Sequence, residues 1–133
     1  MTDWVAQGVA LGVRDDGRDV LDVRKTVFET GVLVGCTGSA HVKRGACDVV
    51  AGVKLELAPP VREDKEGELF VRVDITCSLQ DEKRVREQEG DLSRCLEGSL
   101  GGEVIDRAKL CIVPGADGLA WNVCVKCFAV RLL

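Results

Sequence analysis

Arginine and lysine side chains gather at two places in the chain where they could contact phosphate groups. Arg84, Arg86 and Arg94 surround the start of a predicted helix, and Lys43 and Arg44 end one strand of a predicted hairpin. A guanidinium group can bind a phosphate through two parallel hydrogen bonds without reading a base, which suits contact with a nucleic-acid backbone. These five side chains are therefore the candidate RNA-binding residues.

The carboxylates between these arginines support a second interpretation. Glu82, Glu87 and Glu89 are interspersed with Arg84 and Arg86, and charged runs of mixed sign are usually solvated. On this interpretation, which is the default, the two arginines pair with neighbouring carboxylates on a solvated loop. The two tryptophans and three phenylalanines, with no tyrosine, supply few surfaces on which unpaired bases could stack. Both interpretations remain open from the sequence.

The seven cysteines could suggest disulfides or zinc, but their pattern favours neither. Their number is odd, and most lie in apolar segments, where a reduced thiol behaves as a small hydrophobe. Cys124 and Cys127 form a CxxC pair within a strand-like run, where residues three apart point to opposite faces. A second ligand pair is missing, and the single histidine, His41, is far away in sequence. We expect no metal site, no disulfide scaffold and no cofactor.

The residues that could act as an acid, a base or a nucleophile form no recognisable catalytic set. His41 has no identifiable partner and stands beside Lys43 in a predicted strand, where a surface or interface role is expected. The glycine-containing segments 35–38 and 98–102 lack the strand–loop–helix context of a phosphate-binding loop. Asp74 lies within a strand, where a salt bridge is its expected role. The sequence therefore predicts no catalytic residues.

Alternating apolar and polar residues predict that these side chains are carried mainly by antiparallel strands. The run 68–79, for example, places Leu69, Val71, Val73 and Ile75 on one face of a strand. The other expected elements are a short helix or arm over 3–12, strands over 25–34, 39–44, 48–57, 109–113 and 119–130, and a hairpin connection at 44–47.

A single substantial helix is expected after the charged run. Residues 80–90 are predicted to be a solvated loop, and Asp91 is predicted to cap a helix. Leu92, Leu96, Leu100 and Val104 follow at a spacing of four, which gives that helix one apolar face. Strands followed by a helix and then further strands indicate the α+β fold class.

Composition limits the protein classes that remain. The chain has 133 residues, of which 46% are hydrophobic and 30% charged, so one domain with a packed core is expected and disorder is not. No apolar run approaches the roughly 20 residues of a membrane helix, and Met1–Trp4 lacks the basic start of a secretory signal. The net charge of −4 argues against a DNA-coating protein, although it allows a local basic patch that binds RNA.

Several motifs in this order and spacing are similar to those of a known family. The matching stretches are 14–18 (RDDGR), 29–32 (ETGV), 38–43 (GSAHVK) with Gly45, 48–56 (DVVAGVKLE), 66–67 (EG), 70–74 (FVRVD), 77–78 (CS), 110–112 (LCI) and 121–125 (WNVCV). Over residues 8–127 the sequence resembles the N-terminal half of the ribonuclease PH-like subunits of the RNA exosome ring. Among these, it resembles the catalytically inactive member that partners an active-type subunit in archaea.

The resemblance implies a ribosomal protein S5 domain 2-like (ribonuclease PH-like) fold that is truncated. Residues 1–133 would be the N-terminal half of the domain, with residues 1–24 as an N-terminal arm and charged turn. The half that carries the catalytic acid and phosphate loop in active relatives would be absent. Because the sequence stops straight after an apolar strand, we expect its sheet to need a cover from further polypeptide or another subunit.

The implied function is that of a non-catalytic subunit in a hetero-oligomeric ring of ribonuclease PH-like exosome subunits. Such a ring threads single-stranded RNA for 3′–5′ processing and degradation, including that of ribosomal RNA, in the nucleus with its nucleolus and in the cytoplasm. No contact with membranes or DNA is implied. The alternatives are a phosphorolytic 3′–5′ exoribonuclease of the ribonuclease PH family and an unrelated α+β interaction domain.

Overall fold

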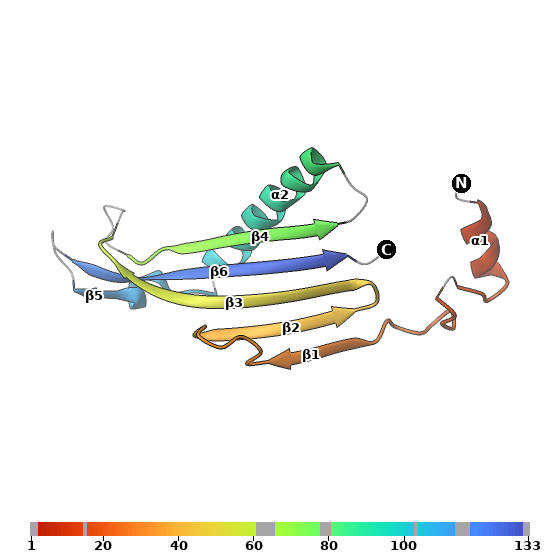
Figure 1. Ribbon diagram of the computed structural model, residues 1–133, viewed down its shortest axis with the longest axis horizontal. Helices are drawn as coiled ribbons and strands as arrows, with labels where there is room; N and C mark the ends of the chain where they lie inside the picture. The colour runs from red at the N-terminus through yellow and green to blue at the C-terminus, as the bar shows by residue number, and fades with distance from the viewer. Residues whose placement is uncertain are drawn as a thin grey trace.

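The computed structural model describes residues 3–14, 16–60, 66–77, 81–102, 104–113 and 118–131. In chain order its elements are α1 (Asp3–Ala10), β1 (Thr26–Thr30), β2 (Gly38–Arg44), β3 (Cys47–Ala58), β4 (Leu69–Cys77), α2 (Glu82–Gly101), the 3₁₀ helix η1 (Arg107–Leu110), β5 (Cys111–Val113) and β6 (Leu119–Arg131). Figure 1 shows one sheet with α2 along one face and α1 standing apart.

The sheet has the strand order β1-β2-β3-β6-β4, and the short β5 pairs with the beginning of β6. Neighbouring strands are antiparallel except β4 and β6, which are parallel. Parallel neighbours require a crossover connection, and here α2 supplies it. The predicted α+β class is confirmed.

The alternation predicted for residues 68–79 is confirmed by the burial of β4. Leu69, Val71 and Val73 are buried on the face that α2 covers, while Phe70 and Arg72 between them are exposed. The pairing of β4 with β6 places Val71 beside Val125 and Phe70 beside Cys124. On β6, Val125 therefore lies on the face that α2 covers, and Cys124 lies on the opposite face.

The hydrophobic core lies between α2 and the two strands nearest to it. Leu69, Val71 and Val123 are its buried centre. Partly buried apolar side chains surround them, namely Val53, Leu96, Leu100, Ile105, Leu110 and Val125. On the other face of the sheet, which we call the open face, Phe70 and Phe128 remain 46% and 49% exposed. No described helix or strand packs on the open face.

The helix begins ten residues earlier than the sequence predicts, at Glu82 instead of after Asp91. The expected solvated loop is therefore wrong for residues 82–90; Gln80 lies outside the described residues. Asp81 caps the helix by accepting a hydrogen bond from the Lys83 N–H at 3.2 Å, and Glu, Lys, Arg and Gln are good helix formers. Leu96 and Leu100 reach the core as predicted, but Val104 lies beyond the helix and is exposed.

The first strand is shorter than predicted, ending at Thr30 instead of Val34. Gly31 and Gly35 adopt positive φ angles of 71° and 85°, so the chain leaves the sheet and folds into a loop. The loop lies over β3, because a Cβ added at Gly52 would stand 3.1 Å from the Cys36 sulfur. The glycine therefore leaves room for the loop on the open face.

The other strand predictions are confirmed with small shifts at their ends. β2, β3 and β6 match the expected runs closely. Gly45 has the positive φ angle that the turn between β2 and β3 needs. The run expected from Lys109 begins as a 3₁₀ helix, and β5 starts at Cys111.

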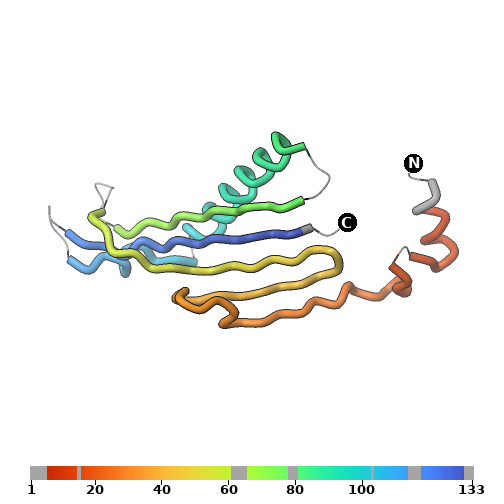
Figure 2. The backbone as a smooth tube through the Cα atoms, viewed as in Figure 1, coloured from red at the N-terminus to blue at the C-terminus, as the bar shows by residue number. Residues whose placement is uncertain are grey.

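The described residues from α1 to Arg24, which we call the N-terminal arm, lead to β1 and lie beyond the end of the sheet (Figure 2). Its turn is held by two arginines: Arg14 donates to the carbonyls of Asp19, Val20 and Asp22, and Arg18 donates to that of Asp22. Leu21 and Val23 are at least four-fifths exposed. None of the helices in the described chain is both long and apolar enough to cross a membrane.

Candidate nucleic-acid interface

Strand pairing brings distant parts of the chain to one end of the sheet. Thr26 of β1 pairs with Arg44 of β2, and Arg44 pairs with Cys47 of β3. Cys47 in turn pairs with Arg131 of β6, which lies beside Cys77 of β4. One row of residues thus crosses the sheet at the end where β2 turns into β3 and where β4 leads into α2 (Figure 1).

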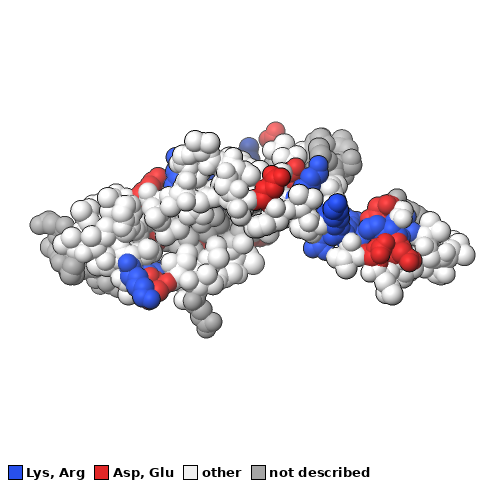
Figure 3. All heavy atoms as spheres, turned by 90° about the horizontal axis from the view of Figure 1, so that it is seen from below, with Lys and Arg blue, Asp and Glu red and all other residues white. Residues whose placement is uncertain are grey.

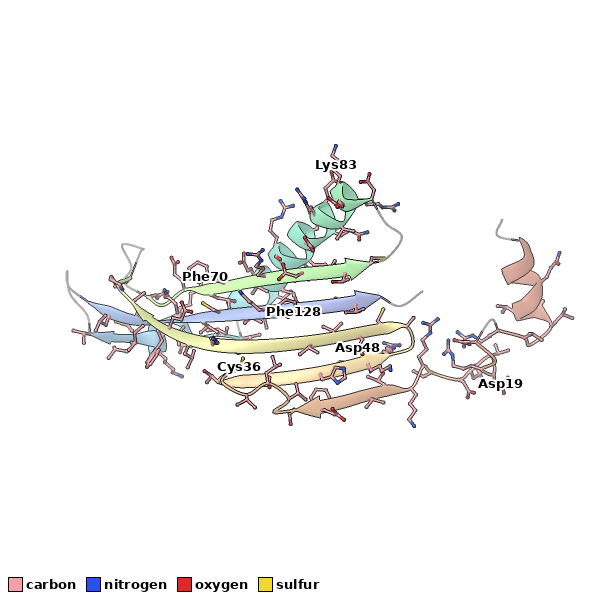
Figure 4. All side chains as sticks on the ribbon, viewed as in Figure 1. Asp19, Cys36, Asp48, Phe70, Lys83 and Phe128 are labelled. Atoms are coloured by element: carbon pink, nitrogen blue, oxygen red, sulfur yellow. The ribbon has the colours of Figure 1, made fainter. Side chains whose placement is uncertain are left out.

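Basic side chains accumulate at this end of the sheet. We call them the basic end; its members are Arg24, Lys25, Lys43, Arg44, Lys83, Arg84 and Arg86. Figure 3 shows basic side chains gathered where the sheet meets the N-terminal arm, and Figure 4 places Lys83 at the start of α2. Of the five predicted RNA-binding residues, Lys43 and Arg44 lie at the turn between β2 and β3, and Arg84 and Arg86 lie in the first turns of α2, beyond the end of β4. The structure therefore places the two pairs at the same end of the sheet but at strands β2 and β4, which β3 and β6 separate.

The predicted arginines differ in how they are engaged. Arg86 approaches Glu82 at 3.6 Å, with both side chains at least three-quarters exposed, and no described ion pair involves Arg84, Lys43 or Arg44. The predicted partner Glu89 instead faces β4, where it accepts a hydrogen bond from the Ile75 N–H at 2.7 Å. The expected pairing of both arginines with local carboxylates is thus present only for Arg86.

Arg94 lies away from the other four predicted residues. It is ten residues beyond Arg84 in α2, which is about 15 Å along the helix axis. Its guanidinium donates to the Asp91 carboxylate at 2.6 Å and to the Gly90 carbonyl at 3.3 Å. The structure does not bring it to the basic end.

A cleft of about 490 Å³ lies where the basic end meets the N-terminal arm. It is lined by Asp16, Arg18, Arg24, Lys25, Gly45 and Ala46. The Asp16 carboxylate lies 2.8 Å from Arg18 and 3.7 Å from Arg24, and the hydrogen bond from Arg18 lowers the pKa of Asp16 below its ordinary 3.8. Three cations and one anion therefore leave the cleft with a net positive lining.

Sequence reasoning missed Arg24, Lys25 and Lys83 as members of the basic end. The position of Arg24 and Lys25 could have been inferred, because these two residues come just before the first predicted strand. An antiparallel hairpin places the start of that strand beside the end of its partner, here Thr26 beside Arg44. Lys83 was assigned to a loop, so its position in the first turn of α2 could not be inferred.

The CxxC pair behaves as its strand position predicts. Cys124 pairs with Lys54 on the open face, whereas Cys127 pairs with Ala51 on the face that α2 covers. Burial raises the pKa of the Cys127 thiol, and burial together with the nearby Glu56 carboxylate raises that of Cys124. Across the described ranges no group of three or more His, Cys, Asp or Glu side chains could hold a metal ion.

A family model and two curated relatives point to the same kind of protein. Residues 22–127 match the model of the RNase PH domain, described as the 3′ exoribonuclease family, domain 1. The exosome complex component Rrp42 of Methanosarcina acetivorans is 31% identical over 85% of this chain and 44% of its own length. That of Methanopyrus kandleri is 34% identical over 84% of this chain and 43% of its own. The chain thus spans less than half the length of these curated relatives.

Solved structures agree with these matches. The Archaeoglobus fulgidus exosome with RNA bound to the active site is similar over 97% of this chain and 52% of the matched chain, with a TM-score of 0.73 and 26% identity. An archaeal exosome core is similar over 96% of this chain and 48% of its own, with a TM-score of 0.71 and 28% identity. Sequence and fold thus agree that the chain belongs to the ribonuclease PH family of 3′ exoribonuclease domains.

Proposed function

We propose that the chain acts as a non-catalytic, Rrp42-like subunit of an exosome ring, supporting 3′–5′ RNA processing and degradation, ribosomal RNA included, through subunit interfaces and RNA contacts. The carrying observation is the similarity of 97% of the chain to part of an archaeal exosome structure. In this proposal residues 1–133 form the N-terminal half of a ribonuclease PH-like domain, with residues 1–24 as its arm. Its partners are other ribonuclease PH-like subunits and single-stranded RNA.

The engagement of acidic side chains supports a non-catalytic role. Glu89 and Glu97 accept hydrogen bonds from the backbone of β4, and Asp48 lies 2.6 Å from His41. Asp74 is bonded to Arg72 at 3.1 Å, the salt bridge expected from the sequence. These carboxylates are occupied by structural contacts, so a general acid or base among them would first have to give up its partner.

The basic end is the proposed RNA contact. Lys43, Arg44 and Arg84 are free to contact phosphates, and Arg86 is held only by an exposed ion pair of low expected strength. Arg94 would extend the contact along α2 if it exchanged Asp91 for a phosphate. Because a cation that binds a phosphate releases counterions, removing any one of these side chains should flatten the dependence of RNA affinity on salt.

The experiment combines co-purification with an RNA degradation assay. The chain should co-purify with a ribonuclease PH-like ring subunit, and alone it should not degrade single-stranded RNA in the presence of phosphate. Phosphate-dependent degradation by the chain alone would instead support the exoribonuclease alternative, which the family description favours. Failure to co-purify with any such subunit would contradict the ring assignment.

A charge-reversal pair tests the RNA surface separately. The double variant K43E/R44E should weaken single-stranded RNA binding about tenfold or more at low salt, because two of the proposed phosphate contacts become repulsive. The control K54E reverses an exposed lysine in β3, away from the basic end, and should bind RNA normally. R94E shows whether the surface extends along α2. An equal weakening in K54E would contradict a localised surface.

The cellular location follows from the same proposal. We place the protein in the nucleus, including the nucleolus, and in the cytoplasm, where exosome rings process RNA. Cell fractionation would test this proposal: an antibody against the chain should detect it in the same fractions as a ring partner.

A further inference from the structure

The single histidine of the chain lies between two carboxylates on the open face. His41 is in β2, its Nε2 atom lies 2.6 Å from Asp48 Oδ1 in β3, and its Nδ1 atom lies 3.7 Å from Glu29 Oε2 in β1. In the strand register, Glu29 of β1 stands directly opposite His41. On β3 the residue opposite His41 is Val50, and Asp48 lies two residues before it. Three adjacent strands thus meet at one imidazole ring.

The charges around the ring are few and can be assigned to their strands. On the open face, β1 presents Glu29, β3 presents Asp48 (labelled in Figure 4), and β2 itself presents Lys43 two residues from the histidine. The remaining neighbours on this face, Val27, Ser39 and Val50, carry no charge. His41 and Asp48 are each about one-quarter exposed on their side chains, whereas Glu29 is 62% exposed.

Protonation decides how many of these contacts the ring can make. A neutral imidazole has one N–H donor and one acceptor, whereas an imidazolium has two donors. Only the charged ring can therefore attract carboxylates at both nitrogen atoms. Asp48 is the closer partner, and its hydrogen bond is the main reason why the pKa of His41 is raised above the ordinary 6.5; Glu29 raises it further, against partial desolvation.

Apart from its five-residue pairing with β2, β1 has few means of attachment to the sheet. It is an edge strand that pairs only with β2, and all five of its residues are exposed. Asp48 joins β2 to β3, which remain paired along the whole of β2. Among the described residues, the contact between Glu29 and His41 is the one ion pair that joins β1 to the sheet.

We propose that Glu29, His41 and Asp48 form a protonation-dependent clamp, which fastens the edge strand β1 to the sheet when the imidazole is charged and loosens it when the imidazole is neutral. Asp48 keeps the ring charged and oriented, and Glu29 responds to that charge. The clamp is a property of the chain's own fold and does not depend on the proposed function.

The sign of the pH dependence follows from the direction of the shift. A group whose pKa is raised in the folded state stabilises that state below its unfolded pKa, and the contribution is lost as the pH rises through the folded pKa. For His41 the contribution is therefore complete below about 6.5 and disappears on the alkaline side of that value. β1 should be held more firmly in mildly acidic solution than in alkaline solution.

The first measurement is an NMR titration of the His41 ring in the full chain, where one histidine gives one unambiguous set of signals. The midpoint should lie above 6.5, fall most in Asp48→Asn, and fall less in Glu29→Gln. Glu56→Gln is the matched control, a carboxylate on the open face of β3 that does not face His41. A wild-type midpoint at or below 6.5, or an equal shift in Glu56→Gln, would overturn the proposal.

The second measurement tests how firmly β1 is held, through the exchange of its backbone amides. Amide exchange of β1, corrected for intrinsic rates, should be about two- to fivefold slower one pH unit below the measured midpoint than one unit above it, the range an exposed ion pair gives. The Ile75 amide of β4 is the internal reference and should not change. His41→Asn and Glu29→Gln should each abolish the difference. An undiminished difference in either variant, or none in the wild type, would overturn the clamp.

Discussion

The two edges of the sheet, β1 and β4, are protected in opposite ways. On β4, the N–H groups of the alternate residues Val71, Val73 and Ile75 donate to side chains of α2. On β1 no described element covers the outer edge, and every residue is exposed. An unprotected edge can pair with a strand of another chain, so such pairing is blocked at β4 and possible at β1.

The protection of β4 is built from the periodicity of the helix. Glu97, Ser93 and Glu89 are spaced by four residues, so they lie on one side of α2. They accept from the β4 amides at 3.0, 3.1 and 2.7 Å, and we call these three hydrogen bonds the β4 seal. The helix runs along the edge strand in a register that is fixed by polar contacts as well as by apolar packing.

The difference shows where the chain obtains its stability. The buried apolar residues of the described chain all belong to β4 and β6, namely Leu69, Val71, Val73, Ala120 and Val123. Toward β1, Phe28 is 63% exposed, and the strand is held by hairpin pairing and by exposed charges. Changes near β4 should therefore cost much more free energy than matched changes near β1.

The largest contrast is expected between two glycine substitutions. A Cβ at Gly67, just before β4, would collide with the Trp121 carbonyl oxygen and approach Leu110 Cβ at 2.5 Å. Gly67→Ala should lower the free energy of unfolding by about 3 kcal/mol, because the backbone itself must move. At Gly31, just after β1, an added Cβ would contact nothing, and the only strain would come from the positive φ of 71°. Gly31→Ala should therefore lower the free energy of unfolding by about 1 kcal/mol. Urea unfolding measures both, and equal decreases would contradict the contrast.

The β4 seal should be next in size. Glu97→Ala, Ser93→Ala and Glu89→Ala each leave a partly buried amide without its acceptor and should cost about 1–2 kcal/mol in urea unfolding. Glu97→Gln and Glu89→Gln keep an acceptor and should recover part of that stability. Amide exchange should accelerate at the β4 residue whose acceptor has been removed.

The control for the seal is an exposed glutamate of the same helix. Glu87→Ala should change the free energy of unfolding by less than about 0.5 kcal/mol, as is usual for surface substitutions. A seal variant that behaved like Glu87→Ala would show that apolar packing alone holds α2 against β4.

Sequence patterns were sufficient for most of the strands, for physical reasons. Period-two alternation was enough to place Leu69, Val71 and Val73 on one face of β4, where the structure buries them. The glycine at 45 identified the hairpin turn through its backbone freedom. From this hairpin the position of Lys43 and Arg44 at one end of the sheet could be predicted.

The errors arose where contacts with other elements decide the structure. The first half of α2 has many charges and few apolar residues, so it resembled a solvated loop. Its helical form is supported by the Asp81 cap and by Glu89 on β4. The prediction that His41 has no partner was also wrong, because Glu29 and Asp48 reach it only through the register of three strands. Arg94 was grouped with Arg84 because both stood near the predicted start of the helix; the structure places both within α2, ten residues apart.

The smallest effect is expected on the β1 side, where exposed charges hold the N-terminal arm. Arg18 donates a hydrogen bond to Asp16 and lowers its pKa below 3.8. A depressed pKa means that the ionised carboxylate stabilises the folded turn above 3.8, and that this contribution is lost as the pH falls through the lower folded value. The arm should therefore loosen in acid before the sheet unfolds, and an NMR titration of the Asp16 carboxyl group should show the low midpoint.

Asp16→Asn should produce the same loosening at neutral pH. Exchange of the Gly17 amide, which donates to the Arg14 carbonyl at 2.9 Å, should accelerate, and added salt should reduce the difference from the wild type. Asp91→Asn removes a more exposed carboxylate that likewise pairs with an arginine, Arg94 on α2, and should leave the arm unchanged. If Asp16→Asn altered global unfolding as much as the β4 seal variants do, the two edges would share one stability, and the contrast between them would be wrong.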